Sequence, residues 1–274
     1  MRYAPTENAL AARARETADN SKLVEHISTQ RKFQIENFLG NDPKVYDIEK
    51  KFGKYLALPI DVPKFELDDP EHFKDWYFKH AIKPVKRNGD YVAQVTGPEY
   101  SPFYSVDLIQ KVGDDWDLNM HTDEFKKEFP KLWQQFHESL PVKDILTLNL
   151  WSSVQTFSEH RDSAEMWDGP NSFRIPLYDE NPESTLYVMD NPTKPYNVED
   201  TFFLPQLEET NTYMWNNLRC MHGSVKDDNY SKILAVVIAI VDLEQYETVL
   251  NRSIEKYKDH CLVSKYTIDN YVNV

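Results

Sequence analysis

A histidine and an aspartate separated by one residue stand in the stretch SEHRDSAEMW, and another histidine follows in NNLRCMHGSV. These residues are His160, Asp162 and His222, and the two histidines are 222 − 160 = 62 positions apart. In a β-strand, residues two positions apart point to the same face, so His160 and Asp162 are able to aim at one point. A histidine on a neighbouring strand would complete a set of three metal ligands.

Two imidazoles and one carboxylate on one side of a metal form the facial triad of non-haem Fe(II) oxygenases, which leaves the opposite positions open. His-x-Asp alone is a weak signal, and a second copy occurs at His121 and Asp123. That copy opens a predicted helix, where Thr122 or Asp123 is expected to be the N-cap, so it is interpreted as structural. The remaining histidines lie in polar, helix-like stretches and are expected to be exposed or satisfied by neighbours: His26, His72, His80, His137 and His260.

The second half of the chain has the pattern of β-structure. From residue 145 onward, about eight short apolar or alternating runs are separated by turn-forming residues, which is typical of a sandwich or barrel. The most apolar run, KILAVVIAIVD, suits a strand that is buried on both faces. His160 ends one of the predicted strands, and His222 lies on a later one.

The first half is predicted to be mainly helical. Helices are expected at 45–58, at 69–82 with Asp69 as N-cap, and at 121–140, and Asn88-Gly89 predicts a hairpin. We therefore expect one mainly β domain over 1–274. A helical and hairpin support region at 1–144 would pack on an eight-stranded core at 145–242, and a helical tail would follow at 243–274.

At this point the sequence resembles a known family, the 2-oxoglutarate- and Fe(II)-dependent dioxygenases. Their pattern is His-x-Asp/Glu, a gap of some 50–70 residues, a second His, and a basic residue about ten positions later. His160, Asp162, His222 and Lys232 follow it in order and spacing. The stretch EHRDSAEMWDGPNSFRIPLY is also similar to the branch of aspartyl/asparaginyl β-hydroxylases and small amino-acid hydroxylases. The resemblance covers roughly 145–242 and implies a double-stranded β-helix (jelly-roll, cupin-like) core.

The resemblance implies that His160, Asp162 and His222 bind Fe(II), with 2-oxoglutarate and O₂ as co-substrates. Lys232 stands where many members have Arg-x-Ser, although the sequence here reads Lys-Ile-Leu. Arg174, in SFRIPLY, is a second candidate for the 2-oxoglutarate carboxylate, because a guanidinium binds both carboxylate oxygens. We favour Lys232 for 2-oxoglutarate and Arg174 for a substrate carboxylate. Halogenases of this superfamily lack the carboxylate ligand, so Asp162 favours hydroxylation or desaturation.

Composition limits the class of substrate. The net charge of −14 and the lack of a basic stripe argue against nucleic acid. No long apolar run predicts a membrane span, and two cysteines in 274 residues suit a reducing cytoplasm. Two cations directed at the pocket favour a small carboxylate-bearing substrate such as an amino acid. The alternatives are a peptide or protein side-chain hydroxylase, and a non-catalytic metal- or ligand-binding β-barrel protein.

Overall fold

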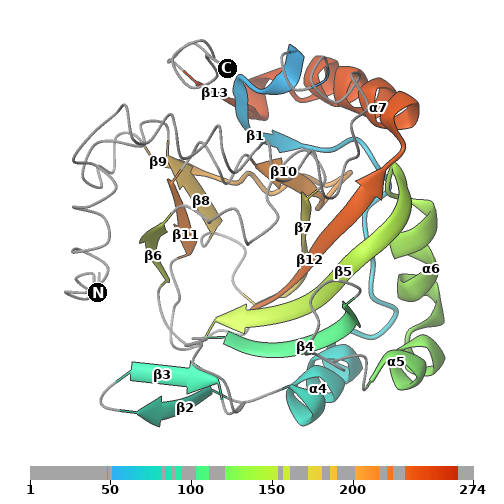
Figure 1. Cartoon of the computed structure of the whole chain (residues 1–274), viewed down its shortest axis with the longest axis vertical. Helices are drawn as coiled ribbons and strands as arrows, with labels where there is room; N and C mark the ends of the chain where they lie inside the picture. Colours follow the sequence, from blue (N-terminus) through green and yellow to red (C-terminus); the bar gives the residue numbers. More distant parts are fainter. Residues whose placement is uncertain are drawn as a thin grey trace.

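The computed structural model is shown in Figure 1. It describes residues 48, 51–81, 84–87, 90–93, 103–110, 121–153, 157–160, 172–180, 186–189, 201–215, 221–224 and 232–264. Asp162, the predicted carboxylate ligand, lies outside these residues.

Eight consecutive strands form the centre of the fold. They are β5 (Val142–Ser153), β6 (Phe157–His160), β7 (Ser172–Asp179), β8 (Leu186–Met189), β9 (Thr201–Phe203), β10 (Tyr213–Trp215), β11 (Met221–Ser224) and β12 (Lys232–Val241). One sheet contains the order β10-β7-β12-β5, and the other has the order β6-β11-β8-β9. The chain thus passes repeatedly from one sheet to the other, and all pairs are antiparallel. This is the winding of a double-stranded β-helix, and it confirms the predicted fold class.

Strands from outside the eight-stranded core enlarge one of the sheets to seven strands. They are β1 (Tyr55–Pro59), β4 (Phe103–Gln110) and β13 (Leu262–Val263), in the order β13-β1-β10-β7-β12-β5-β4. The helix predicted over 45–58 is therefore wrong at its second half. Four of the five β1 residues are buried, and β1 pairs with β10 and β13. Pairing on both edges overrides a weak local helical preference.

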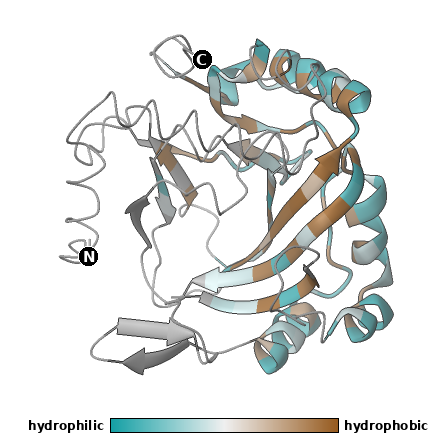
Figure 2. Ribbon diagram, viewed as in Figure 1, coloured by the Kyte–Doolittle hydropathy of each residue, from teal (hydrophilic) through white to brown (hydrophobic). Residues whose placement is uncertain are grey.

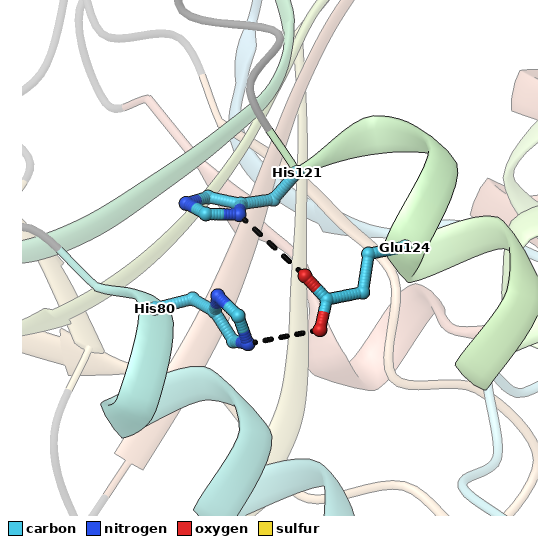
Figure 3. A group of neighbouring side chains, drawn as sticks. All are labelled: His80, His121 and Glu124. Atoms are coloured by element: carbon cyan, nitrogen blue, oxygen red, sulfur yellow. Dashed lines mark ion pairs between the residues drawn. The ribbon is translucent and has the colours of Figure 1, made fainter.

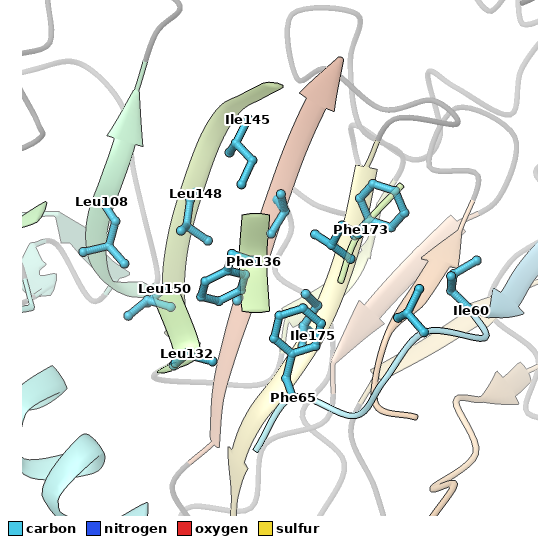
Figure 4. Packing of buried hydrophobic residues seen from close by; sticks show 14 of the residues in the cluster. Ile60, Phe65, Leu108, Leu132, Phe136, Ile145, Leu148, Leu150, Phe173 and Ile175 are labelled. Carbon is cyan, nitrogen blue, oxygen red and sulfur yellow. The ribbon is translucent and has the colours of Figure 1, made fainter. Parts of the chain in front are cut away.

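The hydrophobic core lies between the seven-stranded sheet and the helices that cover its outer face. Leu148, Leu150, Phe173 and Ile175 point from the sheet toward Phe136, and all are fully buried (Figure 4). Strand β12 lies between β5 and β7, as expected for the most apolar run. Figure 2 shows hydrophobic residues along β12, and hydrophilic residues on the outer surfaces of the helices.

Helices cover the outer face of the seven-stranded sheet. Helix α4 (Pro70–His80) begins as predicted, because the Asp69 side chain accepts a hydrogen bond from the His72 amide at 3.0 Å. The single helix predicted over 121–140 is instead two helices, α5 (Thr122–Glu128) and α6 (Pro130–Glu138). Pro130 separates them, since the residue before a proline is disfavoured in helical conformation.

The predicted cap of α5 is also wrong. The N-cap is His121, without a side-chain cap hydrogen bond. The Thr122 hydroxyl instead donates to the Leu108 carbonyl at 2.5 Å and ties the start of the helix to β4.

The hairpin prediction is confirmed. Strands β2 (Pro84–Arg87) and β3 (Asp90–Ala93) pair with Arg87 opposite Asp90, as expected for the hairpin around Asn88-Gly89. The tail forms α7 (Leu243–Lys256), with Asp242 as N-cap, followed by the short helix η4 (Lys258–His260). Among the helices in the described residues, none combines the length and apolarity required to cross a membrane.

Candidate metal and carboxylate site

The two histidines of the predicted triad meet at one position of the four-stranded sheet. His160 on β6 is the register partner of His222 on β11, although 62 residues separate them in the chain. Directly opposite residues of an antiparallel pair have Cα atoms about 4.5–5.5 Å apart. The register shifts between His222 and Ser224, which marks a bulge or irregularity, and bulges are common next to active sites. Asp162, two positions after the end of β6, lies outside the described residues.

The direction of the His222 side chain follows from its neighbours. His222 is also the register partner of Val188 on β8, so the two side chains share a face of the sheet. Val188 packs with Ala57 and Tyr213 of the seven-stranded sheet, so this face is turned toward that sheet. His222 is 8% exposed, which places its imidazole between the two sheets.

The seven-stranded sheet presents polar residues to the same space. Its outer face carries the apolar core, and the residues that alternate with that core point inward. Across four neighbouring strands, one inward-pointing row contains Asp107, Asn149, Val236 and Arg174, and Tyr213 continues it on β10. A row of polar groups inside a sandwich is unusual for packing alone, since buried polar groups are costly unless they bind a partner.

Arg174 is buried in this row, with 6% of its surface exposed. Its guanidinium donates to the hydroxyl of Ser172, two positions earlier on the same face of β7. Thr147 is also on the inner face, and its hydroxyl oxygen is buried without a hydrogen-bond partner in the part of the chain that the structure describes. A buried guanidinium next to hydroxyl groups is suited to a carboxylate, which accepts from both.

Lys232 begins β12, and its ammonium lies 2.5 Å from a carboxylate oxygen of Asp179 on β7. Burial lowers the pKa of Lys232, and the hydrogen bond that its ammonium donates to Asp179 opposes that effect. A buried ammonium is costly without an anionic partner. Asp179 is such an anion within the chain. An ammonium has three N–H donors, so this pair is compatible with binding a second carboxylate.

Asp107 is a further titratable group of the inner row. Burial raises its pKa to about 6, well above the usual value for aspartate. The sequence did not predict five polar residues at this site: Asp107, Thr147, Asn149, Ser172 and Asp179. A signal was present in the run ILTLNLWSS, where Thr147 and Asn149 alternate with buried leucines. Such alternation marks two faces of a strand, but it does not say which ligand the polar face meets.

A second group of possible metal ligands lies at the helices, on the other side of the seven-stranded sheet (Figure 3). His80, at the end of α4, and His121 and Glu124, at the start of α5, offer ligand atoms within 4.8 Å of one another. The sequence did not link these residues. His121 and Glu124 are three positions apart at a helix start, but only the packing of α4 against α5 brings His80 to them.

No family model and no curated protein matches this sequence. Solved structures of low similarity do match. One is the non-haem α-ketoglutarate-dependent epimerase SnoN from nogalamycin biosynthesis, with 11% identity and a TM-score of 0.37, covering 72% of this chain and 84% of that one. Another is a prolyl 4-hydroxylase from Pseudomonas putida, with 10% identity and a TM-score of 0.36, covering 72% and 100%.

A third match is a 2-oxoglutarate–Fe(II) oxygenase family oxidoreductase from Burkholderia pseudomallei. It has 10% identity and a TM-score of 0.37, and the match covers 73% of this chain and 93% of that one. At such identities and TM-scores, a common activity does not follow from a similar course of the chain. Any inference about the chemistry of this protein therefore rests on its own residues: the paired histidines of β6 and β11, the buried Arg174 and the half-buried Lys232.

Proposed function

We propose that this protein is an Fe(II)- and 2-oxoglutarate-dependent oxygenase that acts on a small molecule. The observation that carries the proposal is the cross-strand pairing of His160 with His222 inside a double-stranded β-helix. Asp162 follows β6 by two positions and would be the carboxylate ligand. Two imidazoles and a carboxylate are the donor set that keeps one side of an iron ion open.

The described residues fit such a metal. His222 is buried on the face that meets the larger sheet, where a metal would be shielded from bulk water. With Fe(II), 2-oxoglutarate and O₂ bound, the metal centre would supply the oxidation of a C–H bond, with succinate and CO₂ as co-products. The role of the protein is to orient the reactants and to exclude water.

Two inward-pointing cations are available for carboxylates. Arg174 is opposite Val236, and Lys232 precedes Val236 by four positions on β12. At about 3.3 Å per residue, the two cations are about 13 Å apart along the strand, so each is able to bind a different carboxylate. We assign 2-oxoglutarate to Lys232 and a substrate carboxylate to Arg174. The Lys232–Asp179 pair makes the reverse assignment the main alternative, because the charge of Lys232 is already compensated within the chain.

The substrate that suits a buried guanidinium is a small molecule with a carboxylate, such as an amino acid. Arginine is a strong choice for such a group, because its planar fork donates two parallel hydrogen bonds to it. The net charge of −14 disfavours nucleic acid as a substrate. A peptide or protein side chain is the competing substrate class, and it would place its carboxylate against the same residue.

The test is a coupled assay on protein purified without oxygen. The protein is loaded with Fe(II), and succinate is measured with and without 2-oxoglutarate. Succinate that depends on both iron and 2-oxoglutarate supports the proposal, since such enzymes often turn over slowly without their substrate. A library of amino acids and other small carboxylates is then screened by mass spectrometry for products that gain one oxygen atom or lose two hydrogens.

The outcomes separate the alternatives. Metal binding without succinate, for any member of the library or any peptide, would indicate a binding protein. Product formation that requires iron but not 2-oxoglutarate would indicate a different metal enzyme. Succinate that rises only with peptides would assign the competing substrate class.

A further inference from the structure

We propose that His80, His121 and Glu124 form a Zn²⁺ site that fastens the end of α4 to the start of α5. This site is separate from the proposed iron site and shares no residue with it. The proposal rests on three potential ligands from two helices that the sequence does not connect (Figure 3).

The distances are close to those of a metal site. Glu124 lies between the two imidazoles, with one carboxylate oxygen 3.2 Å from His80 Nε2 and the other 3.8 Å from His121 Nδ1. Ligand atoms around a tetrahedral Zn²⁺ with bonds of about 2.0–2.1 Å are roughly 3.3 Å apart. The widest separation, within 4.8 Å, therefore needs an adjustment of up to about 1.5 Å, which side-chain rotation supplies.

His80 is poorly explained as a simple hydrogen-bonding partner of Glu124. Its Nε2 atom is buried, and its contact with Glu124 does not have hydrogen-bond geometry, although the two atoms are 3.2 Å apart. A ring nitrogen close to a carboxylate, but not directed at it, is expected where both face a common third atom.

The surroundings hold His80 in a fixed position. The ring of Trp76 packs against His80 at 4.8 Å between centroids and limits its motion. An imidazole that is already held in place loses little further freedom when it binds a metal.

The donor set indicates the metal and the geometry. Two imidazole nitrogens and one carboxylate oxygen suit Zn²⁺, and the fourth position would hold a water molecule. The same donors are able to bind Fe(II), but zinc binds more tightly to a given site of this type. His121 and Glu124 are partly exposed, so the metal is able to enter from solvent.

The experiment uses the 274-residue chain, stripped of metal by a chelator and then incubated with Zn²⁺. After desalting, bound zinc is measured by mass spectrometry in the wild type and in Glu124→Gln and His121→Ala. We expect each variant to bind about one Zn²⁺ per chain fewer than the wild type, because three protein ligands leave no spare one. With Zn²⁺ at a hundredfold excess over its Kd, the Tm of the wild type should rise by roughly 5 °C, and that of the variants by less.

His72 offers a matched control. It lies on the same helix as His80 and contacts Glu128 of α5 at 3.2 Å, but no third ligand joins that pair in the described residues. His72→Ala should retain the full zinc content. Equal zinc in the wild type, Glu124→Gln and His121→Ala would overturn the proposal and leave the cluster as a metal-free ion pair. Glutamine has nearly the same shape as glutamate, so a loss of zinc in Glu124→Gln is not explained by unfolding of the protein.

Failure here is distinguishable from failure of the proposed oxygenase. In the His222→Ala background, Glu124→Gln should still lower the bound zinc by about one ion per chain, because the two sites are independent. If Glu124→Gln abolishes succinate formation and His222→Ala does not, the cluster at the helices is the iron site and both assignments are wrong.

Discussion

His160 and His222 lie directly opposite one another on β6 and β11, although the strands are far apart in the sequence. Because both strands belong to the smaller sheet, whose inner face meets the larger one, this pairing makes a shared metal possible. It also leads to a direct test on iron content.

His222→Ala and His160→Ala should each lose most of the Fe(II) that the wild type binds, about one ion per chain, because a facial triad has no spare protein ligand. Iron is measured after anaerobic loading of metal-free protein and desalting, in the Glu124→Gln background, so that the helical site does not add to the count. His260→Ala is the control, since His260 is exposed on the short helix η4. Full iron binding by His222→Ala would exclude the triad.

The assignment of the two cations is tested by uncoupled succinate formation against 2-oxoglutarate concentration. Loss of a charge-assisted hydrogen bond costs about 1.5–3 kcal/mol, so Lys232→Ala should raise the KM for 2-oxoglutarate roughly 10- to 150-fold. Arg174→Ala should leave that KM near the wild-type value and abolish coupled product. A shifted curve for Arg174→Ala alone would reverse the assignment.

Asp179 provides a sharper version of the same test. If 2-oxoglutarate binds Lys232, its carboxylate shares the ammonium with Asp179. Asp179→Asn should then lower the KM for 2-oxoglutarate, because a competing negative charge is removed. If Asp179→Asn leaves the KM for 2-oxoglutarate unchanged, while Arg174→Ala behaves as predicted above, Lys232 does not belong to the 2-oxoglutarate site.

The reaction outcome depends on Asp162. A carboxylate ligand occupies the position that chloride needs, so assays with excess chloride should still give oxygenated or desaturated product. Mass spectrometry separates the oxygenated from the desaturated product by mass, and it recognises a chlorinated product by the isotope pattern of chlorine. A chlorinated main product would contradict the role of Asp162 as a ligand.

The raised pKa of Asp107 predicts a pH effect on stability. Since the pKa is about 6 in the folded protein and near 3.8 in the unfolded chain, the folded state binds more protons between these values. The contribution of this group is full below about pH 4 and is lost as the pH rises through about 6. Asp107→Asn should therefore gain in Tm relative to the wild type between pH 4 and pH 7. A Tm difference that does not change with pH would show that Asp107 is not buried as described.

The core between α6 and the larger sheet is tested by Phe136→Ala. Phe136 is fully buried against the sheet, so its removal should cost about 3–5 kcal/mol of unfolding free energy in urea titrations. Phe203 is 44% exposed, and Phe203→Ala should cost only about 0.5 kcal/mol. Similar losses for both would place Phe136 outside the core.

Much of the fold was predictable from local patterns. The apolar run of β12, the turn-bounded strands after residue 145 and the Asp69-Pro70 helix start each carry their signal within a few residues. Strand β1 was not predictable, because Tyr55–Pro59 becomes a strand only through pairing with β10 and β13, more than 150 residues away. Local propensity is weak, and such distant pairing overrides it.

The same distinction applies to the sites. The sequence by itself determined which residues have the chemistry: His160, Asp162 and His222 by type and spacing, and Lys232 and Arg174 by charge. Only the tertiary structure decided which of them meet. The register of β6 with β11 brings two histidines together, and the approach of β12 to β7 gives Lys232 the carboxylate of Asp179. The packing of α4 on α5 likewise brings His80 close to Glu124. Contacts between distant segments depend on how the elements pack in three dimensions, and the spacing of residues along the chain does not reveal them.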